Sequence, residues 1–239
     1  MPAEKKLFLL TTNIPGSGKS TVGKAIEQVA ADNHLRTYTI NEFKLFGEWL
    51  GQHSTEVTWG PDEGDGAIVN LTPQQYADVF DYVQDKMVDE FLDHYQEVDI
   101  IISEAARDVS GVSYVPLFEY LIKELGDLTD FVDLDVYVDN IKELKRRVRK
   151  RAEKQPNSAS VAVVNLYLKD MNKKTYPHST STATAAMYPD NFIFAGHVDN
   201  TFTDKKAVEE NRVPDHLLTQ IDGILAQVLA LRASKGDDE

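Results

Sequence analysis

The stretch that decides the fold is Leu7-Phe8-Leu9-Leu10-Thr11-Thr12-Asn13-Ile14-Pro15-Gly16-Ser17-Gly18-Lys19-Ser20. Its apolar run, 7–10, is typical of a buried strand, and the sequence 19–31 after the glycines predicts a helix. A glycine-rich turn between a strand and a helix lets backbone N–H groups surround a phosphate, while the positive end of the helix dipole faces the anion. The stretch therefore predicts a phosphate-binding loop at the first strand-to-helix turn of an α/β domain.

The loop agrees with the fingerprint G-x-x-x-x-G-K-[ST] at Gly16, Gly18, Lys19 and Ser20, but Asn13 stands where the leading glycine is usual. Asparagine tolerates left-handed backbone angles better than other residues with a side chain, so the turn can survive. The fingerprint predicts ATP and Mg²⁺ as cofactors, with ATP inferred because no guanine-reading Asn-Lys-x-Asp motif occurs. The expected cofactor-binding residues are Asn13, Pro15, Gly16, Ser17, Gly18, Lys19, Ser20 and Thr21. The alternative is an ordinary turn with a solvated lysine.

The composition bounds the class of protein. The chain has 239 residues, 42% of them hydrophobic, which is enough for the core of one domain. Its net charge of −14 argues against a protein that coats nucleic acid through bulk electrostatics. The net charge does not exclude a local basic patch. The absence of cysteine excludes disulfides, thiolate nucleophiles and Cys-based zinc sites.

The amino-terminal sequence lacks the apolar stretch of a signal peptide, because its apolar run ends at Leu10. No stretch approaches the roughly 20 apolar residues that span a bilayer. We therefore expect a cytoplasmic protein with no membrane partner, whose oligomeric state cannot be read from the sequence.

Periodicity predicts strands that alternate with helices along the chain, which implies a parallel sheet covered on both faces. Residues 51–72 are interpreted as a long acidic loop, 177–187 as a Ser/Thr/Ala-rich loop and 234–239 as a disordered tail. The expected strands are 7–10, 36–40, 98–103, 131–138 and 192–198, and the expected helices 19–31, 42–50, 73 to before 98, 114–125, 139–154, 159–173 and 215–232.

Four segments, in order, resemble the kinase domain of phage-type polynucleotide kinases and the related small P-loop kinases. They are 15–20 in the phosphate loop, Thr39-Ile40-Asn41-Glu42, Ile101-Ile102-Ser103-Glu104, and the basic run 144–151, which is followed by a helix of related pattern. The resemblance covers roughly residues 7–175. It implies a three-layer P-loop NTPase fold, α/β, with a mostly parallel five-stranded sheet, helices on both faces and an arginine-bearing lid at about 142–187. We expect a single kinase domain over residues 1–233.

Two candidate carboxylates follow strands. A kinase must orient the acceptor hydroxyl and accept its proton, and Glu42 stands just past the second strand, where the family places an aspartate. Glu104 stands at a strand end beside the phosphate loop, where it could hold Mg²⁺ together with Ser20 or contact the acceptor. The alternatives are a capping or surface carboxylate for Glu42 and, for Glu104, a structural hydrogen bond to Ser20 or to a neighbouring loop. Arg107 could contact substrate or pair with Asp108 on the surface.

A dense run of basic residues, from Lys142 to Lys154, occurs within this acidic protein. Such a run is often a solvated helix or a nucleic-acid arm. In a kinase, lid arginines neutralise charge on the transferring phosphoryl group, and Arg147 and Arg151 share one helix face. We expect Arg151, and after it Arg147, to be catalytic.

The remaining polar candidates give weaker signals. The sequence 196–201 is interpreted as a loop that either ends a strand or holds adenine. His34, His53, His94, His178 and His216 have no metal-ligand spacing and receive no role. Phe43, Phe46 and Trp49 are predicted to form a packed helix face, with a base-stacking platform as the alternative.

The sequence thus predicts an ATP-dependent P-loop kinase, with Lys19, Glu42, Glu104, Arg147 and Arg151 as catalytic residues. The favoured acceptor is the hydroxyl of a small molecule, nucleoside or nucleotide. A kinase acting on a hydroxyl of DNA or RNA stays open, as does a nucleotide-hydrolysing switch without an acceptor.

Overall fold

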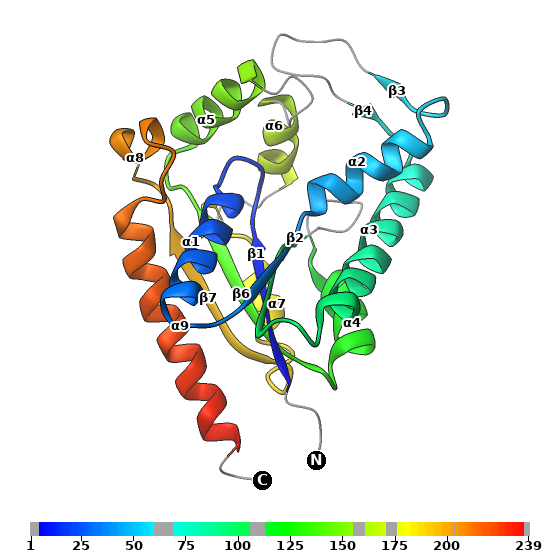
Figure 1. Cartoon of the computed structure of the whole chain (residues 1–239). Helices are drawn as coiled ribbons and strands as arrows, with labels where there is room; N and C mark the ends of the chain where they lie inside the picture. The colour runs from blue at the N-terminus through cyan, green and yellow to red at the C-terminus, as the bar shows by residue number, and fades with distance from the viewer. Residues whose placement is uncertain are drawn as a thin grey trace.

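The molecule is built around a parallel sheet, seen in a computed structural model that describes residues 5–59, 69–105, 113–154, 161–170, 176–202 and 204–236. The sheet has the order β2-β5-β1-β6-β7, and every neighbouring pair of strands is parallel. Figure 1 shows these strands at the centre of the molecule, with helices around them. The predicted α/β class with a five-stranded sheet is confirmed. The strands are β1 (Lys6–Thr12), β2 (Thr37–Ile40), β5 (Ile100–Glu104), β6 (Thr129–Tyr137) and β7 (Phe192–Asp199).

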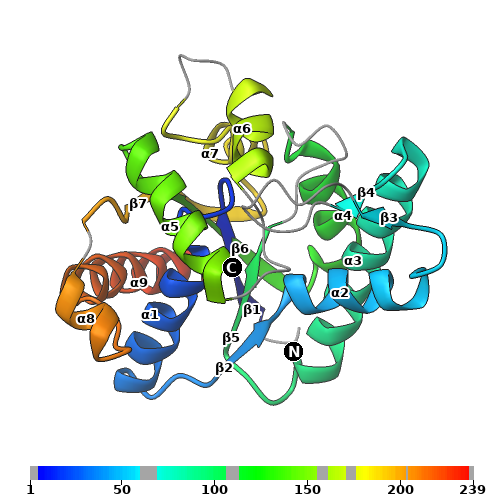
Figure 2. The same cartoon turned by 90° about the horizontal axis from the view of Figure 1, so that it is seen from above.

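Helices cover both faces of the sheet because successive side chains of a strand point to opposite faces. On β1, Leu7 and Leu9 pack with one set of helices, whereas Phe8 and Leu10 pack with the other. The first set is α1 (Lys19–Asp32) and α9 (Asp215–Gly236), which lie side by side in both views (Figures 1 and 2). The second set is α2 (Glu42–Gln52), α3 (Pro73–His94), α4 (Val115–Leu125) and α7 (Ser181–Ala185).

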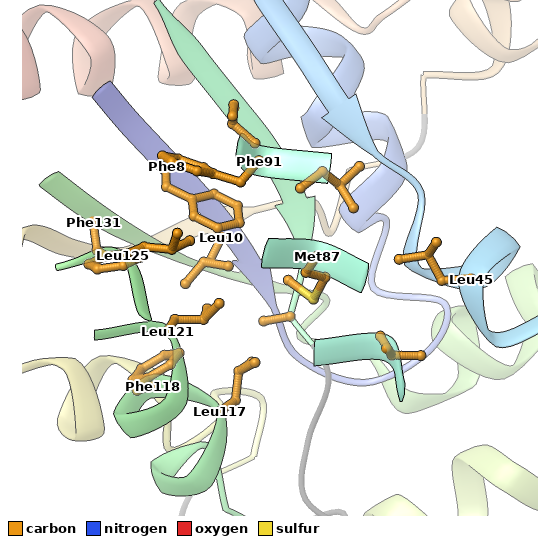
Figure 3. Packing of buried hydrophobic residues seen from close by; sticks show 14 of the residues in the cluster. Phe8, Leu10, Leu45, Met87, Phe91, Leu117, Phe118, Leu121, Leu125 and Phe131 are labelled. Carbon is orange, nitrogen blue, oxygen red and sulfur yellow. The ribbon is translucent and has the colours of Figure 1, made fainter. Parts of the chain in front are cut away.

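The core on the second face is rich in aromatic side chains. Phe8 packs with its ring centroid 5.6 Å from that of Phe91 on α3 and 5.9 Å from that of Phe131 on β6. Figure 3 shows these rings beside Met87 and the leucines of α4. This packing fixes α3 and α4 against the strands whose carboxyl ends form the site.

Two further helices, α5 (Ile141–Lys154) and α6 (Val161–Asp170), lie above the carboxyl ends of the strands (Figure 1). Leu144 and Val148 of α5 and Val161 and Val164 of α6 pack with Ile14 of the glycine-rich loop. The helices of the expected lid are therefore joined to this loop by a small apolar cluster of their own.

Several segments differ from the sequence-based expectations. The acidic segment 51–72 contains a short antiparallel pair, β3 (Thr58–Trp59) with β4 (Val69–Asn70), and its residues 60–68 lie outside the described ones. Residues 177–187 include α7 instead of being loop throughout, and a short helix, α8 (Lys205–Glu209), was not predicted. Helix α9 extends to Gly236, so residues 234–236 are helical and the expected tail is wrong there.

The start of α3 was predicted correctly. Thr72 caps the helix, Gln75 completes a capping box, and Pro73 occupies the first turn, where its missing N–H costs nothing. Within the described parts of the chain, no helix is long and apolar enough to cross a membrane.

Candidate active site

The glycine-rich loop between β1 and α1 adopts three left-handed backbone conformations. The φ angles are 97° at Asn13, 88° at Gly16 and 103° at Gly18, so the tolerance expected of asparagine is used. A Cβ on Gly16 would lie 2.6 Å from Cγ2 of Val148, which explains why glycine is required beneath α5. Gly18 is the cap residue before α1 and has no side chain, so no cap side chain accepts a hydrogen bond from the first N–H groups of this helix.

Asn13 is fixed by hydrogen bonds on every side. Its backbone N–H donates to the Tyr114 hydroxyl (2.8 Å), and its side-chain Oδ1 accepts from the Ile14 N–H (2.7 Å). Its Nδ2 donates to Oδ1 of Asp135 on β6 (2.8 Å) and to the Pro177 carbonyl (2.9 Å). The side chain that replaces the usual glycine therefore anchors the start of the loop to the sheet, a contact that glycine could not make.

Lys19, Ser20 and Glu104 meet at the carboxyl ends of β1 and β5. Glu104 is the register partner of Thr11, and the Ser20 hydroxyl donates a short hydrogen bond to its Oε1. The Lys19 Nζ lies 3.9 Å from the other carboxylate oxygen and donates to the Asn13 carbonyl (2.9 Å). The hydroxyl and carboxylate oxygens side by side are hard ligands of the kind that suits Mg²⁺. The structural hydrogen bond between Ser20 and Glu104, which was the alternative to a metal role, is therefore present, and the metal role of the two residues stays a prediction.

Glu42 is the first residue of α2 and lies near this group. The helix cap is Asn41, whose side chain accepts from the Lys44 N–H (3.0 Å), so Glu42 is not the capping residue. Burial raises the pKa of Glu42 above its ordinary value, the negative charge of Glu104 raises it further, and Lys19 lowers it. These interactions bring Glu42 into the same electrostatic environment as Lys19 and Glu104.

The two arginines expected to act together have different surroundings. Arg147 donates to Oε1 of Glu143 (2.9 Å) and to the carbonyls of Asn200 (2.8 Å) and Thr201 (3.3 Å). Arg151 is affected by the charge of Glu104, which opposes the lowering of its pKa by partial burial. Arg151 therefore interacts electrostatically with Glu104 at the end of β5, whereas Arg147 is held toward the end of β7.

Next to Arg147 an open cavity lies between the start of α5 and the end of β7. It is lined by Asp139, Asn140, Glu143, Asp199, Thr201 and Phe202. The expected loop 196–201 is strand up to Asp199, so only its last two residues contribute to a turn. Asn200 connects this turn to the phosphate loop, because its Nδ2 donates to the Ser17 carbonyl (2.7 Å).

One sequence-based candidate cannot be placed, and one predicted helix face is only partly correct. Arg107 lies outside the described residues. The helix face predicted from Phe43, Phe46 and Trp49 is only partly packed, because Trp49 is 3% exposed but Phe43 is 59% exposed. Phe43 follows Glu42 directly in the sequence, and its ring is open to solvent.

A polar cluster behind the loop was missed by the sequence analysis. Asp133 and Asp135 on β6 are fully buried, and burial raises the pKa of Asp133 to about 8. Nδ1 of His178 and Nδ1 of His197 lie 3.3 and 3.1 Å from Oδ2 of Asp135. The available signal was two aspartates with a period of two inside an apolar strand, which places both on one buried face.

Comparisons with known proteins add little beyond the architecture. Neither a family model nor a curated protein sequence matches the chain. A proposed kinase from Chloroflexus aurantiacus is 16% identical, with a TM-score of 0.48 over 91% of this chain and 98% of its own. The Mycobacterium tuberculosis APS kinase, solved with AMPPNP and APS, is 13% identical, with a TM-score of 0.45 over 95% and 97% of the two chains. At these values the likeness carries no information on substrate or mechanism.

Proposed function

We propose that the chain is an ATP-dependent kinase that transfers the γ-phosphoryl group to a hydroxyl of a small molecule, nucleoside or nucleotide. The observation that carries the proposal is the meeting of Lys19, Ser20, Glu104 and Glu42 at the mouth of a glycine-rich loop. A cation for the phosphates, oxygen ligands for Mg²⁺ and a separate carboxylate for the acceptor are the parts that phosphoryl transfer requires.

The donor end of the site is formed by the loop and the start of α1. Backbone N–H groups of Gly16, Gly18, Lys19 and Ser20 would surround the β- and γ-phosphates, and the Lys19 ammonium would contact the terminal one. Mg²⁺ would be held by the Ser20 hydroxyl and the Glu104 carboxylate, and it would neutralise charge on the phosphate oxygens. The proximity of the two side chains, which are hydrogen-bonded to each other, supports that assignment, because one ion could contact both oxygens.

Glu42 is assigned as the base. Glu104 is engaged with Ser20 and Lys19, whereas the raised pKa of Glu42 means that its carboxylate, once deprotonated, binds a proton more tightly. The acceptor O–H would give its proton to Glu42 as the new O–P bond forms, and the bond from the γ-phosphorus to the bridging oxygen would break to release ADP. The exposed ring of Phe43 lies next in sequence and could pack against an apolar part of the acceptor.

The two arginines are assigned separate roles. Arg151, which interacts with Glu104, would neutralise charge on the transferring group. Arg147 is hydrogen-bonded to Glu143, which lines the cavity. We therefore assign Arg147 mainly to binding the nucleoside part of ATP. In the cavity, the carboxylates of Asp139 and Asp199 could accept hydrogen bonds from an exocyclic amine but would repel phosphates. Direct contact of Arg147 with the γ-phosphoryl group stays a prediction.

One assay tests the proposal. ATP labelled on the γ-phosphate is offered with Mg²⁺ to a panel of nucleosides, nucleotides, sugars and 5′-hydroxyl oligonucleotides, and the products are read beside those of Lys19→Ala. We expect label on a small acceptor with the wild-type chain and none with the variant. Label on oligonucleotides alone would favour the nucleic-acid alternative. Label only in free phosphate would favour a switch, and equal products from both chains would contradict the proposal.

A further inference from the structure

The buried carboxylate of Asp135 and two imidazoles form a three-residue cluster on the sheet. Asp135 on β6 and His197 on β7 are direct register partners, so their side chains leave the same face. His178 comes from the segment just before α7, and its ring centroid lies 4.1 Å from that of His197. The fold thus gathers three metal-ligating side chains that are up to 62 positions apart in the sequence.

The distances between these atoms suit one metal ion. The candidate ligand atoms of Asp135, His178 and His197 all lie within 4.8 Å of one another. Nδ1 of the two histidines stands 3.3 and 3.1 Å from Oδ2 of Asp135. A tetrahedral Zn²⁺ site with bonds of about 2.0–2.1 Å separates neighbouring ligand atoms by about 3.3–3.4 Å. The two measured separations therefore need changes of only a few tenths of an ångström.

The carboxylate is oriented by partners outside the cluster, as in known metal sites. Oδ1 of Asp135 accepts from Nδ2 of Asn13 (2.8 Å), and both of its oxygens accept from the Ser179 N–H (3.2 Å). Asp135 is fully buried, whereas the side chains of His178 and His197 are 38% and 44% exposed. An ion could therefore enter from solvent and meet a ligand that is already fixed.

We propose that Asp135, His178 and His197 bind a Zn²⁺ ion, with a fourth coordination position open to solvent, and that Asn13 ties this site to the phosphate loop. Two imidazole nitrogens and one carboxylate oxygen favour zinc over magnesium, which prefers oxygen ligands. Each Nδ1 binds the ion through its lone pair, and its proton moves to Nε2, so neutral histidines bind without net loss of a proton. This site is separate from the Ser20–Glu104 pair and does not depend on the proposed kinase activity.

The competing interpretation is a metal-free network in which both Nδ1–H groups donate to Oδ2. The two interpretations differ in what Co²⁺ does, because tetrahedral Co²⁺ has intense visible absorption bands and octahedral Co²⁺ has weak ones. The full chain, without a polyhistidine tag, is stripped with a chelator and titrated with Co²⁺ and then with Zn²⁺. Excess Mg²⁺ is present throughout to occupy the oxygen ligands at the phosphate loop.

We expect intense tetrahedral bands that saturate at one Co²⁺ per chain and disappear when Zn²⁺ is added. His197→Ala and His178→Ala should each lose the bands and weaken Zn²⁺ binding by at least about tenfold, since even outer partners of metal ligands cost this much. His94→Ala is the matched control, because Nδ1 of His94 lies 3.4 Å from Glu97 and the part of the chain that the structure describes adds no third ligand to this pair. This variant should bind like the wild type.

A thermal melt gives a second readout that does not depend on the Co²⁺ absorption bands or on activity. Zn²⁺ should raise the Tm of the wild type and of His94→Ala but not that of the two site variants, because only a ligand of the folded state stabilises it. Weak octahedral bands, no binding, or equal bands in His197→Ala and the wild type would each overturn the proposal.

Discussion

The two carboxylates that flank the end of β1 lie in different environments. Glu104 on β5 is the partner of Thr11, and Asp135 on β6 is the partner of Thr12, so they stand on opposite faces of the sheet. The side chain of Glu104 is 32% exposed and contacts a lysine and a serine, whereas Asp135 is fully buried among asparagine, histidine and backbone donors. The first is accessible to a nucleotide, and the second is fixed within the protein.

The difference shows how one edge of a parallel sheet can support two kinds of chemistry. On the β5 side, formed by Lys19, Ser20 and Glu104, the carboxylate charge of Glu104 stays near solvent, where a phosphate and Mg²⁺ could be bound and released. On the β6 side the charge is compensated by fixed donors that also anchor Asn13. If the two regions are independent sites, changes in one should leave the signature of the other intact.

The largest effect is expected from Lys19→Ala, which removes the cation beside Glu104. Phosphoryl transfer should fall by at least about 100- to 1,000-fold, because this charge stabilises the transferring phosphoryl group. The radiolabel assay measures the loss. Lys24→Ala, on an exposed position of the same helix, should keep full activity. Both variants should keep the wild-type Tm and the Co²⁺ bands, and transfer that survives Lys19→Ala would contradict the assigned roles.

The sequence predicted which residues meet near the end of β5, because much of that region is local, whereas their catalytic roles stay predictions. The loop and Lys19 and Ser20 are contiguous, and Glu104 ends an apolar strand whose place in a parallel sheet follows from the alternation of elements. Glu42 follows the second strand for the same reason. The separate orientations of Arg147 and Arg151 could not be predicted, since they depend on the carbonyls of Asn200 and Thr201.

The β6 side could not be predicted because nothing in the spacing of its residues brings them together. His178 was grouped with scattered histidines, and His197 was assigned to a loop, whereas β7 continues to Asp199 and puts His197 in register with Asp135. The same long-range contacts explain Asn13. Its departure from glycine is a tolerated exception in the sequence, but in the structure it is a donor to Asp135.

The next largest effect is expected from Glu42→Gln. Loss of the base should lower kcat by about 10²- to 10⁴-fold with little change in the KM for ATP. The base acts only when deprotonated, and the pKa of Glu42 is raised, so the wild-type rate should increase with pH above the range of an ordinary glutamate. This rise should disappear in the variant. Glu48→Gln, exposed on the same helix, should retain both the rate and its pH dependence; an unchanged profile in Glu42→Gln would reassign the base.

Smaller effects are expected from the two arginines, one mainly on the rate of transfer and the other mainly on ATP binding. Arg151→Ala should lower kcat by about 100-fold while weakening ATP binding only a few-fold, because its charge acts on the transferring group. Arg147→Ala should mainly weaken ATP binding, since its bonds lie on the cavity side. Single-turnover rates and equilibrium binding of ATP separate the two, with Lys150→Ala on the exposed face of α5 as the control. Equal losses of rate and binding for Arg151→Ala would mean that it only binds ground-state phosphate.

The smallest effect concerns the acceptor, whose KM should change little between low and moderate salt. A polynucleotide needs a positively lined path, and its affinity falls steeply as salt reduces counterion release. The concentrated positive charge of this chain is on α5, which the donor phosphates can use, and α5 itself carries Glu143, paired with Arg146 and Arg147. The expected acceptor-side segment carries Glu56 and, outside the described residues, Asp62, Glu63 and Asp65. Those carboxylates repel a polyanion and suit a neutral or cationic acceptor.

Steady-state kinetics across the salt range, with the best small acceptor and with a 5′-hydroxyl oligonucleotide, makes the comparison directly. Efficient phosphorylation of the oligonucleotide, with a KM that rises many-fold with salt, would restore the polynucleotide alternative.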